Sequence, residues 1–215
     1  MPWLALWPIT PAVPASTVVG RIVRSEGVVR SLSTGTASAP EHPVTVGDEI
    51  RTDTLIDTTA GGRVAVALGD DASLRVDVGS RIVMLRERVV RLEQGAVYVD
   101  SRLDQNRPIL VQTQNGDVRD IGTQFEVRTD TSTVLIRVRE GEVIVDRRGS
   151  SISARAGELL RIDRQGYFFA SIRVVPGSVF GISPWLSIAL NPAFFSQSEY
   201  CNNVQHSPSG VCVNV

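Results

Sequence analysis

Short segments in which apolar and polar residues alternate recur along the chain between residues 18 and 164. Alternation with a period of two places one set of side chains in a core and the other in water, and the β-branched residues that dominate here suit a pleated strand. Gly, Asp, Asn or Ser soon follows each segment, as expected where short strands end in turns. The segments are residues 64–68, 74–78, 89–92, 97–99, 109–111, 125–127, 134–138 and 143–145. Because no ten-residue stretch shows a period of 3.6, the sequence predicts an all-β fold.

Three glycines precede pairs of alternating valines, and they refine this prediction. They are Gly62, Gly95 and Gly141. A glycine can adopt a positive φ and reverse the chain before the next strand. The spacing of the three is too uneven to predict a regular solenoid. Successive hairpins are therefore expected to form an antiparallel two-sheet sandwich or a solenoid-like roll of many short strands, with an irregular C-terminal tail.

Charge and histidine content exclude several classes of protein. The formal net charge is −1, from 22 basic and 23 acidic residues, whereas a nucleic-acid binder needs a concentrated excess of Lys and Arg. The two histidines, His42 and His206, lie far apart in the sequence. A histidine-based metal site or a Ser/His/Asp triad is therefore not expected.

Carboxylates are the remaining candidates for chemistry. Asp53 and Asp57 flank one apolar pair, and Asp70 and Asp71 lie between two predicted strands. Two such acids could serve a hydrolase, and Asp70, Asp71 and Asp77 could bind calcium. However, an Asp at a strand junction usually hydrogen-bonds the backbone of its own turn, and one loop supplies few calcium ligands. We therefore expect a protein that is not an enzyme, with no catalytic residue, no cofactor and no metal site.

Several sequence blocks follow one another in an order that is typical of a known protein family. They cover residues 46–52, 65–75, 90–99, 111–116, 121–128, 139–143 and 156–158. The most specific block has the pattern Gly-Thr-x-Phe-x-Val, formed by Gly122, Thr123, Phe125 and Val127. In these blocks the sequence is similar to the FecR domain over residues 20–166. The resemblance supports a FecR-like β domain at residues 18–166.

The residues that carry this resemblance are expected to serve the fold. We call them the hallmark residues: Gly95, Gly122, Thr123, Phe125, Val127, Gly141 and Gly157. Gly122 is predicted to bend the backbone as the chain enters the next strand. Thr123 is then predicted to hydrogen-bond a neighbouring backbone group, while Phe125 and Val127 point into the core. A direct binding role for Thr123 is the alternative.

The resemblance to FecR implies a role in signalling. It implies the periplasmic signal-receiving domain of a transmembrane sensor, anchored in the inner membrane, that regulates an extracytoplasmic-function sigma factor, as in iron or siderophore uptake. The implied partners are an outer-membrane TonB-dependent transducer or another envelope protein, and the sigma factor only through an N-terminal segment missing here. The alternative is a non-catalytic envelope β-domain that binds a glycan or an assembly partner.

Residues 1–17 differ from the rest in composition. Two tryptophans, Trp3 and Trp7, precede a stretch interrupted by prolines, and the apolar part is shorter than a membrane span. Interfacial tryptophans followed by a Pro/Ala linker resemble the outer end of a membrane span. We expect a truncated span end and linker here, with the natural gene beginning upstream; a short disordered leader is the alternative.

Residues 167–215 form a second compositional break. Apart from His206, only Arg173 and Glu199 can carry charge there, and no clean strand or helix period is present. We expect an irregular tail or the product of a frameshift near residues 165–167, with a divergent lobe as the alternative. Cys201 and Cys212 could form a disulfide in an oxidising periplasm only if the tail is native.

Overall fold

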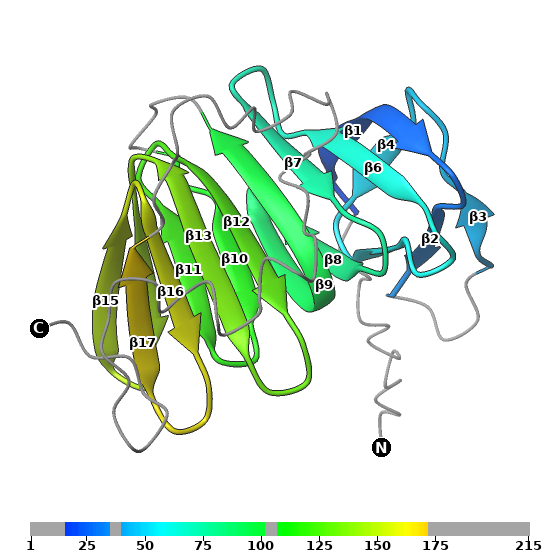
Figure 1. Ribbon diagram of the computed structural model, residues 1–215. Helices are drawn as coiled ribbons and strands as arrows, with labels where there is room; N and C mark the ends of the chain where they lie inside the picture. The colour runs from blue at the N-terminus through cyan, green and yellow to red at the C-terminus, as the bar shows by residue number, and fades with distance from the viewer. Residues whose placement is uncertain (1–15, 35–39, 102–106, 172–215) are drawn as a thin grey trace, which may run out of the picture.

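All regular structure in the described residues is β-strand. The computed structural model describes residues 16–34, 40–101 and 107–171 (Figure 1). The prediction of an all-β fold is confirmed. None of the described residues belongs to a helix that is long and apolar enough to cross a lipid bilayer. The strands are β1 (Val18–Glu26), β2 (Arg30–Ser33), β3 (His42–Pro43), β4 (Glu49–Arg51), β5 (Thr54–Asp57), β6 (Arg63–Ala67), β7 (Ala72–Val76), β8 (Arg81–Arg86), β9 (Val89–Ser101), β10 (Leu110–Thr113), β11 (Gly116–Asp120), β12 (Gln124–Thr129), β13 (Val134–Glu140), β14 (Glu142–Arg147), β15 (Ser150–Arg155), β16 (Glu158–Ile162) and β17 (Tyr167–Ser171).

The strands form two long sheets that share β9. Sheet A has the order β4-β1-β6-β7-β9-β12-β13-β16-β17. Sheet B has the order β3-β2-β5-β8-β9-β10-β11-β14-β15. Residues 89–94 of β9 pair in sheet B, and residues 95–101 pair in sheet A. One strand therefore crosses from one sheet to the other in the middle of the molecule.

Hairpins alternate between the sheets as the chain proceeds. The hairpin β6–β7 lies in sheet A, and β8–β9 begins in sheet B before β9 crosses into sheet A. The hairpin β10–β11 then lies in sheet B, β12–β13 in sheet A, β14–β15 in sheet B and β16–β17 in sheet A. Figure 1 shows this progression from the blue end to the yellow end. The expected two-sheet, solenoid-like roll is what the structure shows.

One pairing departs from the antiparallel expectation, because β10 runs parallel to β9. The reason is the crossing of β9. Its first half lies in sheet B and its second half in sheet A, so the chain must return to sheet B before β10 begins. Parallel neighbours need such a long return connection, whereas a tight hairpin gives antiparallel ones. The sequence contains no local pattern for this return.

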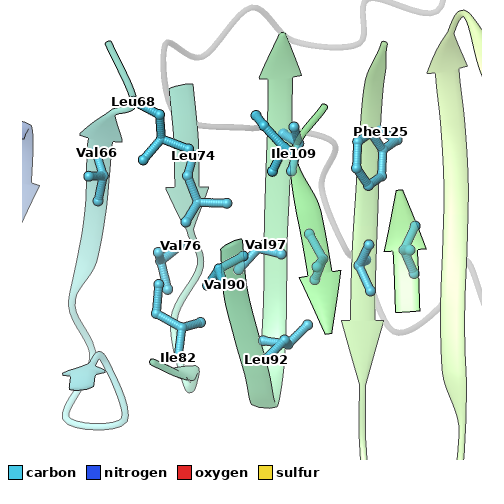
Figure 2. Close-up of a cluster of buried hydrophobic side chains, with 14 of the residues drawn as sticks. Val66, Leu68, Leu74, Val76, Ile82, Val90, Leu92, Val97, Ile109 and Phe125 are labelled. Atoms are coloured by element: carbon cyan, nitrogen blue, oxygen red, sulfur yellow. The ribbon is translucent and has the colours of Figure 1, made fainter. Parts of the chain in front are cut away.

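The core lies between the two sheets (Figure 2). The inner face of sheet A packs against the inner face of sheet B. Each fully buried Val, Leu, Ile or Phe side chain contributes about 1.5–3 kcal/mol to the free energy of unfolding. Side chains of sheet A in this core include Val66, Leu74, Val97 and Phe125, and those from sheet B and its entry include Ile82, Val90, Leu92 and Ile109. The valine-rich side of the alternating segments is therefore the buried side.

The glycine prediction holds in full only at Gly141, which has a φ of 79° and reverses the chain between β13 and β14. Gly95 has the expected positive φ, at 86°, but it does not reverse the chain, because β9 continues through it. The prediction for Gly62 is wrong, because Gly61 takes the positive φ there, at 99°. Gly62 is instead close to the connection between β1 and β2: a Cβ built on it would meet the carbonyl carbon of Val28 at 2.6 Å. It is needed for close approach of two backbones and not for reversal.

The ends of the regular structure differ in their agreement with the sequence. β1 begins at Val18, where the alternating pattern begins. At the other end β17 pairs with β16 and continues five residues past the boundary expected at Gly166. The expected span end before residue 16, the remainder of the tail and both cysteines lie outside the described residues.

Candidate functional site

The hallmark pair Gly122-Thr123 forms a bend between β11 and β12. Gly122 has a φ of 64°, which favours glycine. The Thr123 N–H donates to Ser101 Oγ at 3.1 Å, and the Ser101 N–H donates to the Thr123 carbonyl at 3.0 Å. The bend is therefore fastened to the end of β9. Thr123 therefore hydrogen-bonds a neighbouring backbone group through its own carbonyl, whereas its buried Oγ1 has no hydrogen-bond partner among the described residues.

A buried carboxylate completes this bend. Asp120 is 3% exposed and accepts hydrogen bonds from Ser101 Oγ and from the Ile109 N–H. The Asp120 N–H in turn donates to the Ile109 carbonyl at 3.1 Å. Asp120 thus joins the end of β9, the entry to β10 and the bend. Sequence reasoning missed Asp120 and Ser101; the only signal was an Asp directly before the hallmark block.

Gly141 closes the same bend from the β13–β14 turn. A Cβ on Gly141 would lie 2.6 Å from Thr123 Cγ2 and 2.7 Å from the Gly122 carbonyl oxygen. Real Cβ atoms do not approach backbone so closely, and the φ of 79° disfavours any side chain as well. We call Ser101, Asp120, Gly122, Thr123 and Gly141 the hallmark bend.

The other hallmark residues lie apart from this bend. Gly95 lies within β9 where the strand crosses between the sheets, and a Cβ there would collide with Ser80. Gly157 lies in the β15–β16 turn, and its N–H donates to the Val138 carbonyl at 3.0 Å. Phe125 and Val127 are fully buried in the core. The structure therefore gathers Gly122, Thr123 and Gly141 and separates the remaining four.

The outer face of sheet A carries a second cluster, which the sequence pattern did not reveal. Arg75, Tyr98, Glu126 and Arg137 lie opposite one another on the neighbouring strands β7, β9, β12 and β13. Further polar side chains lie in the rows on either side. We call the whole set the charged face: Arg63, Arg75, Asp77, Tyr98, Asp100, Gln124, Glu126, Arg128, Arg137 and Arg139.

Glu126 is the centre of the charged face and is only 3% exposed. Burial raises the pKa of its carboxyl group, and the guanidinium groups of Arg137 and Arg128 oppose this rise. Arg137 Nη1 lies 3.4 Å from Glu126 Oε2, and Arg128 Nε lies 3.5 Å from Oε1. A buried carboxylate is thus held between two cations, each contributed by the outer face of the same sheet.

Tyr98 lies beside Glu126 and is held by three polar groups. The Arg75 guanidinium carbon lies 5.4 Å from the centroid of the Tyr98 ring, and the phenol donates to Gln124 Oε1 at 3.1 Å. Burial raises the pKa of Tyr98, although Arg139 acts in the opposite direction. Arg75 and Tyr98 also line a shallow hollow, whose remaining lining residues are Arg63, Val76, Asp77, Ala96 and Val97.

The calcium alternative is not supported by the positions of two of its three carboxylates, Asp77 and Asp71. Asp77 lies on the charged face, with Oδ1 3.0 Å from Arg63 Nε and Oδ2 3.6 Å from Arg128 Nη2. Asp71 pairs with the buried Arg88. Across residues 16–34, 40–101 and 107–171, no three His, Cys, Asp or Glu side chains gather as a metal site would require.

The first pair of acids proposed for chemistry is also engaged in local structure. Partial burial acts to raise the pKa of Asp57, but hydrogen bonds from Thr59, with Arg81 and Arg30 nearby, bring it below its ordinary value. Asp57 Oδ1 accepts from the Thr59 N–H at 2.8 Å, as in a turn-capping Asp. Asp53 has a φ of 59° in the β4–β5 turn.

A comparison with known protein families matches one continuous part of the chain. Residues 54–144 match the family described as FecR protein. This part of the chain is a FecR domain. It contains the hallmark bend, Gly95 and the charged face, whereas Gly157 lies beyond the matched residues. The members of the FecR family are regulatory proteins and are not known as enzymes.

Two crystal structures of a proposed anti-sigma factor from Parabacteroides distasonis, at 1.65 and 2.50 Å resolution, are similar to this chain. Each has a TM-score of 0.49 and 23% sequence identity, and the match covers 55% of this chain and 59% of the other. The match thus spans about three fifths of that protein's length. No curated protein matches the sequence.

Proposed function

We propose that the FecR domain is the periplasmic signal-receiving part of a transmembrane sensor that regulates an extracytoplasmic-function sigma factor. The observation that carries this proposal is the family match over residues 54–144, which includes the hallmark bend and most of the two-sheet core. The proposed pathway is of the iron or siderophore uptake type. The sigma factor would be contacted through a segment upstream of the described residues, and the membrane through an upstream span.

The state of the acidic groups supports a role in binding. On the charged face, Glu126, Asp77 and Asp100 each lie within 4 Å of an arginine nitrogen. A general acid or base must be able to exchange a proton with a substrate. Carboxylates engaged in this way are better suited to holding side chains in place for recognition.

We place the recognition surface on the charged face. Its side chains are ordered by one another before a partner arrives, which lowers the entropy lost on binding. Arg139 is exposed at its edge and interacts with Tyr98, so it is available to an incoming acidic group. An outer-membrane TonB-dependent transducer or another envelope protein would supply that group.

A reporter assay in cells tests the proposal. The full-length gene is expressed with its own sigma factor and a promoter reporter, and residues 18–171 are deleted in frame. We expect the promoter to lose its response to the inducing signal, because the receiving body is gone. A normal response after the deletion would contradict the proposed function.

A matched pair of point variants then tests the surface. Arg139→Glu reverses the charge at the edge of the charged face, whereas Arg91→Glu does so at an exposed position on the outer face of sheet B. We expect Arg139→Glu to lower the induced signal about tenfold, the effect of a like-charge contact worth roughly 1.4 kcal/mol, and Arg91→Glu to leave it unchanged. Equal responses in the two variants would move the recognition surface elsewhere on the domain.

A further inference from the structure

The strands at the edges of the two sheets differ in how well they are protected from pairing with another chain. Among the described strands, sheet A ends at β4 and β17, and sheet B ends at β3 and β15. An edge strand exposes unpaired N–H and C=O groups, and proteins protect such edges with short strands, charges or proline. The four edges can therefore be compared for protection.

Three of the edges are protected. β3 has two residues, one of them Pro43, which has no N–H to donate. β4 has three residues, and its Glu49 and Arg51 form an ion pair at 3.6 Å. β15 is mostly polar, with three serines and an arginine among its six residues. These strands discourage pairing with another chain.

β17 has none of these protections. It begins Tyr167-Phe168-Phe169, and these residues are 57%, 44% and 39% exposed. The strand contains no proline and no charged residue. Tyr167 and Phe169 lie on one face, with ring centroids 5.9 Å apart in an edge-to-face arrangement. Figure 1 shows β17 at the yellow end of the roll, beside β16.

The register of β17 shows which backbone groups face outward. The Asp163 N–H donates to the Gly166 carbonyl at 3.0 Å, which makes these two residues a hydrogen-bonded pair. Antiparallel partners alternate between hydrogen-bonded and non-hydrogen-bonded pairs. The N–H and C=O groups of Tyr167 and Phe169 therefore point away from β16, toward the open edge.

The β16–β17 hairpin is also held firmly to sheet B. Arg147 of β14 donates from Nη1 to the Gly166 carbonyl at 3.1 Å and from Nη2 to the Asp163 carbonyl. The Asp163 carboxylate accepts from the N–H groups of Gln165 and Gly166 at 2.9 and 3.0 Å. A strand fixed in this way loses little entropy when another strand adds to it.

We propose that β17 binds an extended segment of a partner protein as an added strand, in which apolar and acidic residues alternate. The apolar side chains would cover Tyr167 and Phe169, which lie opposite the core residues Ile162 and Leu160. The next side chains would lie on the opposite face, near Phe168. The exposed Arg161 lies directly across from Phe168. Asp130 and Asp163 are near enough for Arg161 to help lower their pKa values, but the exposed guanidinium remains accessible to a carboxylate on an added strand.

This inference goes beyond the proposed function, because it concerns an edge outside the matched FecR residues and does not depend on the charged face. Pairing of this kind gives affinity through the main chain and specificity through alternate side chains. Charge complementarity at Arg161 makes the segment acidic.

The test uses the full chain and a fluorescent ten-residue peptide of alternating Val and Glu. The variant Phe169→Pro removes an outward N–H without removing a bond to β16, because proline is tolerated at an edge. The matched control Phe169→Val keeps this N–H and the strand preference. We expect peptide affinity to fall about tenfold or more in Phe169→Pro, to stay within about threefold in Phe169→Val, and to fall about tenfold for a peptide of alternating Val and Lys.

Hydrogen exchange at the Phe169 amide identifies the occupant. We expect fast exchange in the free chain and protection only when the Val/Glu peptide is added. Protection that is independent of protein concentration in the free chain would mean that another part of this chain covers the edge. Protection that grows with concentration would mean a second copy. Either result, or equal peptide binding by Phe169→Pro and Phe169→Val, would overturn the proposal.

Discussion

The hallmark bend ends where β12 of the charged face begins, and the two regions differ in how they tolerate substitution. In the bend, each contact depends on a unique atom: Gly141 has no room for a Cβ, and Ser101 Oγ serves both Thr123 and Asp120. On the charged face, Glu126 has two arginine partners, and Asp77 has two as well. The bend therefore tolerates few substitutions, whereas on the charged face each of these two acids keeps one arginine partner when the other is lost.

This difference explains why the hallmark residues can be recognised in a sequence. A position at which only glycine fits requires glycine in the sequence. A network of charged side chains that can replace one another requires no particular residue at any one position. The hallmark residues therefore indicate the fold, and the sequence of a partner-binding surface beside them can vary. The predictions below test this contrast, from the largest expected effect to the smallest.

The largest effect is expected for Gly141→Ala. Its Cβ would meet Thr123 and the Gly122 carbonyl, so the bend must move, and we expect a loss of more than about 3 kcal/mol in the free energy of unfolding. Gly149→Ala is the matched control, since Gly149 has nearly the same φ of 81° and no atom within 4 Å of the new Cβ. It should lose only about 1 kcal/mol. Urea unfolding measures both, and similar losses would mean that backbone strain alone governs the position.

Ser101→Ala should have the next largest effect. It removes the acceptor of the Thr123 N–H and a donor to the buried Asp120, and buried polar groups left unpaired cost about 1–3 kcal/mol. Ser151→Ala is the control: its hydroxyl donates to Asp146 Oδ1 at 2.5 Å on an exposed edge, so the loss should stay below about 0.5 kcal/mol. Denaturant midpoints of the two variants give the comparison, and a neutral Ser101→Ala would remove the hydrogen-bonded basis of the bend.

Glu126→Gln tests the charged face through its pH dependence. Because burial raises the folded-state pKa of Glu126, the folded protein retains this proton to higher pH than the unfolded chain does. The wild type should therefore lose stability relative to Glu126→Gln as pH rises from about 4.3, the ordinary Glu value, through the raised folded pKa. Below that window the difference between the two proteins should be constant.

Thermal unfolding of both proteins from pH 4 to pH 8 measures this difference. Taking the difference also cancels the opposite trend of Asp130 and Asp163, whose backbone hydrogen bonds lower their pKa values and stabilise the fold until the pH falls through those values. A difference that does not change with pH would mean that Arg137 and Arg128 fully offset the burial of Glu126.

Glu49→Gln should have the smallest effect. The pair between Arg21 Nη2 and Glu49 Oε1 spans 3.4 Å, and both side chains are well exposed. Exposed pairs of this kind contribute at most about 1 kcal/mol and usually less. We expect a change within about 0.5 kcal/mol in urea unfolding, and a larger loss would show that the ion pairs at this end of sheet A act together.

The sequence predicted local features well. Alternation placed the strands between residues 18 and 164, and the block from Gly122 to Val127 indicated both a bend and two core side chains. These features depend on neighbours in the chain. A period of two and a glycine before a strand are visible without knowledge of the pairing.

Features that depend on register could not be predicted. Arg75, Tyr98 and Glu126 become neighbours only through pairing between β7, β9 and β12, and the sequence contains no signal for that alignment. The contact of Ser101 with Asp120 likewise requires β9 to cross between the sheets. β17 was missed because Tyr167 and its neighbours form a continuous apolar run, without the alternation that marks the other strands.

Amide hydrogen exchange at Thr123 is the most direct test of the central claim, that the hallmark pair is a locked, buried part of the fold. Its N–H is bonded to Ser101 Oγ inside the roll, so it should exchange only when the whole domain unfolds, with the same free energy as the slowest amides of β12. Exchange within minutes under native conditions, while β12 stays protected, would contradict this account.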